Sequence, residues 1–244
     1  AQLGYELYHE EKRVMVELHW ALLNRTMTAG LAPEEVWERA ETHPLGDTAI
    51  QVLAPDDLLL YLCAHGTKHH WSRLLWVADV AQVLGAHPNR DGEALLRRAR
   101  ASGGLRTLLL GGALAARWVG ARLPAPIQKE IASDKTVCRL VDEVEARWFG
   151  TKEGLRRPAG WAAFWFSYRT RHRLRDRGAL LAHYAWLAVT PTERDHAFTS
   201  LPASLSWLYY LLRPVRLLRD GGQRLTQRLG RRLQSSSHHA PDSV

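Results

Sequence analysis

The first segment of the chain alternates apolar and polar positions in the way that a β-strand does. Residues 12–20 place two sets of side chains on opposite faces, namely Val14, Val16 and Leu18 against Met15, Glu17 and His19. A period of two is typical of a half-buried strand. The preceding residues 4–8, GYELY, suit a partner strand, with HEEK as the turn. We therefore predict a small β element at the N-terminus.

Beyond residue 20 the pattern of apolar positions becomes helical. A proline followed by two glutamates suits a helix start within residues 32–40, and APDD suits the start of another helix at residues 54–57. A short extended piece, AIQVL at 49–53, interrupts the helical pattern, which continues over 71–88 and through most of the remaining chain. The fold class that follows is mainly α with a small β element at the N-terminus.

Pattern and charge divide the chain into four segments. We expect a β element over 1–24, a helical region over 25–150, a basic helical region over 151–234 and a disordered tail over 235–244. The net charge of +8 is concentrated late, since the stretch from 213 to 232 holds seven arginines against one aspartate, and RTRHRLRDR is similarly basic. These runs are either solvated helix faces or a surface for an anionic partner, such as nucleic acid, nucleotide phosphate or a membrane.

Composition narrows the class of protein. An apolar fraction of 46% suits a folded globular chain. The only two cysteines, Cys63 and Cys138, argue against a disulfide scaffold and fit a reducing cytosol. No transmembrane segment or secretory signal is visible. The chain opens without a methionine and without a capped first helix, as though in the middle of a domain. We therefore expect a fragment or a processed product of a cytoplasmic protein.

Residues 64–84 carry polar side chains inside an apolar stretch, which costs free energy unless those groups are paired or used. In one unbroken helix, Lys68 and Asp79 share a face, with His65 nearby, and lie about 16 Å apart along the axis. If the helix breaks near residues 70–72, Lys68 and Asp79 approach each other instead. The sequence leaves both arrangements open.

Two groups of residues are candidate metal ligands. His65 and His69 have the i,i+4 spacing of zinc ligands, but no glutamate follows His65 as a zinc-protease motif requires. The favoured interpretation is a hydrogen-bonded histidine at a helix interface. Glu17 lies on a strand face two residues from His19, a position suited both to holding a metal and to facing water.

Three stretches of the sequence resemble a family of bacterial proteins described as uncharacterised nucleotidyltransferases. These stretches are VMVELHWALL, LAPDDLLLYLCAHGTKHHWSRLLWVADVAQVL and LPASLSWLYYLLRPVRLL. The resemblance implies a DNA polymerase β-type nucleotidyltransferase fold, with residues 1–24 as a remnant of its α/β sheet, followed by a helical region. In that superfamily a GS turn and a DxD strand hold divalent metal, and a third carboxylate completes the site. Glu17 matches this third carboxylate, so the resemblance implies Mg²⁺.

The resemblance also implies roles for residues on the helices. Lys68 and Asp79 match the family's basic and acidic positions as catalytic residues. Lys68 is expected to face phosphate charge, and Asp79 to orient a basic group or the acceptor. The implied substrate-binding residues are His19, His65, His69 and Arg73.

The chain departs from the family pattern because no GS…DxD motif precedes Glu17. We therefore expect the C-terminal two thirds of such a protein, inactive alone. The full-length form is expected to transfer a nucleoside monophosphate from a nucleoside triphosphate to a small molecule, a protein or RNA. The alternative hypothesis is a noncatalytic helical module that binds nucleic acid or a protein partner through the arginine-rich C-terminal third. A third hypothesis is a membrane-surface helix over 161–177.

Overall fold

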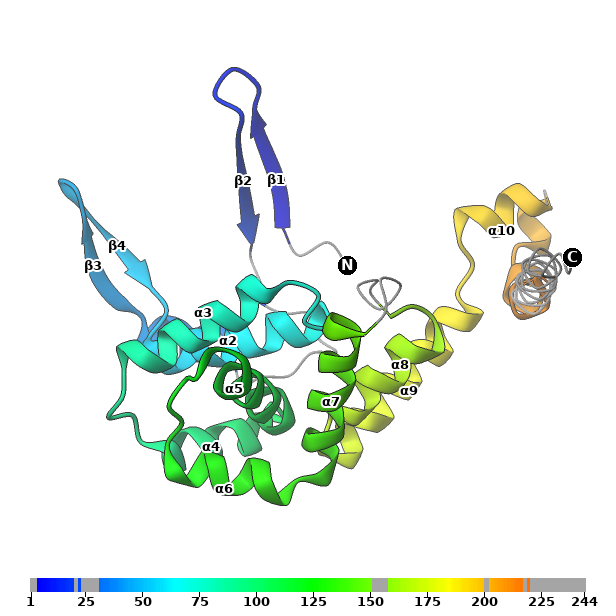
Figure 1. Cartoon of the computed structure of the whole chain (residues 1–244). Helices are drawn as coiled ribbons and strands as arrows, with labels where there is room; N and C mark the ends of the chain where they lie inside the picture. The colour runs from blue at the N-terminus through cyan, green and yellow to red at the C-terminus, as the bar shows by residue number, and fades with distance from the viewer. Residues whose placement is uncertain are drawn as a thin grey trace, which may run out of the picture. The chain divides into compact units, whose positions relative to one another are not determined.

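The chain is mainly helical, with two small antiparallel hairpins near its N-terminus (Figure 1), which confirms the predicted fold class. The computed structural model describes residues 4–19, 22, 31–150, 158–199, 202–216 and 219. The chain forms two compact units, residues 1–179 and residues 180–244. The four predicted segment boundaries stay a prediction, and the predicted tail lies outside the described residues.

Two hairpins hold the strands of the described chain. β1 (Gly4–His9) pairs with β2 (Val14–His19), and β3 (Glu41–Leu45) pairs with β4 (Thr48–Val52). The strand predicted within residues 12–20 is confirmed, and the extended piece at 49–53 overlaps β4. The sequence pattern does not predict β3, because ETHPL lacks a regular alternation of apolar and polar positions.

Helix α5 forms the centre of the first unit. The helices of this unit are α1 (Pro33–Arg39), α2 (Pro55–Lys68), α3 (Leu74–Ala86), α4 (Gly92–Ser102), α5 (Leu105–Val119), α6 (Ala125–Ser133), α7 (Lys135–Phe149) and α8 (Trp161–Arg169). A helix that is apolar on most sides is buried, and α2, α3, α4, α6 and α7 all pack against α5 (Figure 1). This packing places α2 and α3 next to each other. Among the described helices, none combines the length and the apolar character needed to cross a membrane.

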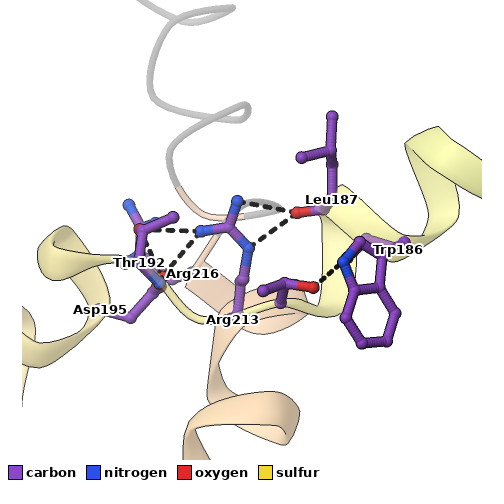
Figure 2. Close-up of polar contacts among 7 residues, drawn as sticks. Trp186, Leu187, Thr192, Asp195, Arg213 and Arg216 are labelled. Atoms are coloured by element: carbon purple, nitrogen blue, oxygen red, sulfur yellow. Dashed lines mark hydrogen bonds and ion pairs between the residues drawn. The ribbon is translucent and has the colours of Figure 1, made fainter. Parts of the chain in front are cut away.

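A buried carboxylate organises the second unit. This unit contains the end of α9 (Leu174–Val189), α10 (Glu193–Phe198), the short 3₁₀ helix η2 (Ala203–Leu205) and a helix over 208–216. Asp195 accepts hydrogen bonds from Arg213 Nη1 at 2.7 Å and Arg216 Nε at 2.6 Å. Arg213 also donates to the Leu187 carbonyl at 3.0 and 2.8 Å (Figure 2). The two arginines therefore tie the last described helix to α9 and α10.

Candidate functional site

One face of the first hairpin carries the predicted metal ligand. The register pairs Glu17 with Glu6 and His19 with Gly4 across the two strands, so these residues share a face. His19 Nε2 lies 3.0 Å from Glu17 Oε2, and both side chains are about half exposed. Glu6 is absent from the predicted site. The alternation in GYELY, combined with a turn at residues 10–13, is the signal that places it opposite Glu17.

The Glu17 carboxylate is close enough to α2 to act on a phenol there. Burial raises the pKa of Tyr61, and the negative charge of Glu17 raises that pKa further. The charge of the hairpin face is therefore felt at the middle of α2. His19 also lines a cavity of about 300 Å³ whose other walls come mainly from α1 and β4.

The outer face of α2 forms a ring cluster with α3. Tyr61, His65 and His69 follow one another at intervals of four residues, and the two imidazole centroids are 4.6 Å apart. The Trp76 ring lies 5.4 Å from that of His65 and 5.1 Å from that of His69. The guanidinium carbon of Arg73 lies 5.8 Å from the Trp76 ring centroid. The structure therefore brings together three of the four predicted substrate-binding residues.

A sharp link separates α2 from α3. α2 ends at Lys68 and α3 begins at Leu74, and between them His70 and Trp71 have positive φ angles of 56° and 54°. The indole nitrogen of Trp148, on α7, donates to the Trp71 carbonyl at 2.8 Å and so holds the link from outside. Of the two arrangements that the sequence leaves open, the broken helix is the one observed.

Lys68 and Asp79 consequently lie on different helices, which pack against each other. Lys68 is exposed in the last turn of α2, and Asp79 is partly buried on α3, three residues after Trp76. The argument that the two residues share one helix face does not apply, because the link separates them. Their catalytic roles stay a prediction.

The arginines of the expected anion-binding surface make contacts within the protein. In the run at 169–177, Arg173 donates to the Arg100 carbonyl, and Arg169 pairs with Glu143. Arg213 and Arg216, at the start of the later run, bind the buried carboxylate drawn in Figure 2. Most of that later run lies outside the described residues, and the anionic partner stays a prediction.

The hairpin face thus carries two exposed carboxylates and an imidazole, and the α2–α3 cluster carries two imidazoles and a guanidinium group. Residues 3–120 match the sequence model of a family described as uncharacterised nucleotidyltransferase. The match confirms the resemblance over this range, which includes Glu17, Lys68 and Asp79. Comparisons with curated proteins and with solved structures gave no match.

Proposed function

We propose that the protein is a nucleotidyltransferase that, in its full-length form, transfers a nucleoside monophosphate from a nucleoside triphosphate to an acceptor. In this reaction the acceptor bonds to the α-phosphorus while the bond to the leaving pyrophosphate breaks. The observation that carries the proposal is the match of residues 3–120, which include Glu17, Lys68 and Asp79, to the nucleotidyltransferase family model. Within that segment, the negative charge of Glu17 helps raise the pKa of Tyr61, which lies on the helix that carries Lys68.

The carboxylates on the hairpin fit Mg²⁺, the metal that the family implies. Glu6 and Glu17 pair across the strands, where two like charges destabilise a bare hairpin. Mg²⁺ is usually held by one or two carboxylates together with water and substrate phosphates, so this open pair suits it. The described residues contain no group of three His, Cys, Asp or Glu arranged around a metal. When bound, the ion would offset phosphate charge, with Glu17 as the proposed ligand and Glu6 beside it.

The helical residues are proposed to act on the substrate itself. Lys68 would contact phosphate oxygens, and Asp79 would orient a basic group or the acceptor. His19 lines the cavity beside α1 and β4. Together with the two histidines and the arginine gathered around Trp76, it would bind the substrate.

The alternative function, a noncatalytic helical module for nucleic acid or a protein partner, has less support. It depends on arginines of the C-terminal third, and several of those that the structure describes bind carbonyls and carboxylates of the protein itself. The cytosol is the proposed location because both cysteines are free thiols.

Turnover of the full-length protein with labelled nucleoside triphosphates tests the proposal. Lys68→Ala and Asp79→Ala are expected to slow transfer, with a loss of about 2–4 kcal/mol of transition-state stabilisation for Lys68→Ala. Lys129→Ala, which removes an exposed lysine from α6, is the matched control and should leave turnover unchanged. Unchanged turnover in the first two variants, or a loss that merely follows a lower melting temperature, would contradict the proposed roles.

A further inference from the structure

A second cavity lies where α2 begins, at the opposite end of that helix from Lys68. Its volume is about 690 Å³, which falls within the range of roughly 300–1,000 Å³ typical of small-molecule sites. Between Pro55 and Lys68 the helix rises about 20 Å. The cavity therefore lies well away from Lys68 along α2.

Three arginines from different parts of the fold line this cavity. Arg39 ends α1, Arg90 lies between α3 and α4, and Arg98 lies on α4. The guanidinium groups of Arg39 and Arg98 repel each other, since burial lowers the pKa of Arg98 and the charge of Arg39 lowers it further. Three cations around one cavity require anionic groups to offset this repulsion.

Two aspartates offset part of the positive charge. Asp57 is fully buried, accepts a hydrogen bond from Arg39 Nε at 2.9 Å and pairs with Arg98. The neighbouring Asp56 pairs with the third arginine. Glu35 reaches Arg39 at 3.5 Å from an exposed position, where water and salt screen its charge. The three guanidinium groups therefore face the two aspartates and the more exposed Glu35.

Arg90 is the most deeply placed of the three arginines. Its side chain is 3% exposed, its Nη1 atom pairs with Asp56, and its Nη2 atom donates to the Val83 carbonyl at 3.2 Å. Its Nε atom has no hydrogen-bond partner among the described residues. A buried cation with an unsatisfied donor costs free energy, and an anion in the adjoining cavity would reduce that cost.

The start of α2 adds a favourable field for an anion. Ala54 and Pro55 line the cavity, and no side chain caps this end of the helix. The positive end of the helix dipole favours negative charge here, part of which Asp56 and Asp57 in the first turn already supply. We propose that this cavity binds the phosphoryl group of a small phosphorylated molecule. The ligand we propose is small because Arg90 is buried in the cavity wall. A nucleic-acid backbone, in contrast, is bound by side chains on an open surface.

Binding of inorganic pyrophosphate to the 244-residue chain tests the proposal, by isothermal titration in buffer with EDTA. Asn89→Asp is the main variant, because Asn89 is exposed in the cavity wall and the change adds a negative charge without removing any ion pair. Saturable binding to the wild type, weakened about tenfold or more in Asn89→Asp, is expected. Gln82→Glu, which adds the same charge at an exposed position on α3, is the matched control and should bind as the wild type does.

Two further variants separate this cavity from other anion sites. Arg98→Gln should abolish pyrophosphate binding, while Arg97→Gln, at an exposed position on the same helix, should not. Lys68→Ala should leave binding intact, whatever the outcome for nucleotidyl transfer. The proposal is overturned if pyrophosphate does not bind, if Asn89→Asp binds it as the wild type does, if Lys68→Ala abolishes binding, or if only an oligonucleotide binds.

Discussion

The Cα atom of Gly66 lies directly against the indole ring of Trp71, five residues further along the chain. A Cβ atom at position 66 would come within 2.6 Å of Trp71 Cζ3, and the backbone N–H of Trp71 donates to the Gly66 carbonyl at 2.7 Å. Trp71 is fully buried although its φ is 54°. The missing side chain at Gly66 is thus what allows α2 to end and the link to turn back onto the core.

Gly66→Ala is expected to destabilise the protein although alanine is the better helix former. The helix preference favours alanine by about 1 kcal/mol, but the added methyl group meets a buried aromatic ring. Overpacking of this kind costs about 1–3 kcal/mol, so we expect a net loss in the free energy of unfolding measured in urea.

Gly85→Ala is the matched control for this substitution. Gly85 lies in α3, and an added Cβ there meets no atom within 4 Å. We expect Gly85→Ala to be neutral or to raise the free energy of unfolding by up to about 1 kcal/mol. Equal stability of the two variants would show that the contact between Gly66 and Trp71 does not constrain the link.

The proximity of Glu17 and Tyr61 makes a second prediction. Glu17→Gln removes a negative charge that disfavours the phenolate, so the pKa of Tyr61 should fall, while burial keeps it above the ordinary value. NMR titration of the Tyr61 ring measures this shift. Glu41→Gln, on the exposed surface of the second hairpin, should leave the pKa of Tyr61 where it is. If the pKa of Tyr61 is unchanged in Glu17→Gln, the charge of the hairpin face does not act on α2.

The local pattern of the sequence predicts the first hairpin but not the link between α2 and α3. Val14, Val16 and Leu18 alternate with polar residues, and alternation over a few positions is enough to indicate a strand. Besides the local contact of Gly66 with Trp71, the link is held by Trp148, which donates to the Trp71 carbonyl from 77 residues away. A window of neighbouring residues contains no trace of that contact.

The candidate site shows the same division between local and distant information. Alternation places Glu17 and His19 on one face, as predicted, whereas Glu6 joins them only through the strand register. The carboxylates at the start of α2 are predicted from helix-dipole preference. The burial of Asp57 against Arg39 and an arginine of α4 follows from tertiary packing, which the sequence pattern does not encode in any short segment.

The two cysteines should react very differently with thiol reagents. Burial raises the pKa of Cys63 to about 12, so this thiol stays protonated and enclosed in the native protein. Cys138 is exposed on α7. Because the thiolate is the reactive form, a disulfide reagent at about pH 8 should modify one thiol per native chain. Cys138→Ser should abolish the reaction, and two modified thiols per folded chain would contradict the burial of Cys63.

The Asp195 carboxylate should make the second unit sensitive to acid. Burial alone raises the pKa of this group, but bonds from Arg216, Thr192 and Arg213 outweigh burial and hold the pKa well below its usual range. A pKa that is lower in the folded state than the unfolded value of roughly 3.9 contributes stability above that pH. The contribution is lost as the pH falls through the folded value. Hydrogen-exchange protection factors over residues 186–199 and 202–216, corrected for the intrinsic exchange rate at each pH, should therefore fall below about pH 4.

Asp195→Asn tests the source of this acid sensitivity. The substitution removes the charge that Arg213 and Arg216 share, and these side chains are each only 11% exposed. Breaking a buried ion pair costs about 3–5 kcal/mol, so protection over residues 186–216 should already be low at neutral pH and should change little on acidification. Glu193→Gln, exposed in the first turn of α10, should stay within about 0.5 kcal/mol of the wild type and keep its pH dependence. If Asp195→Asn retains the full acid response, the titrating group lies elsewhere in the unit.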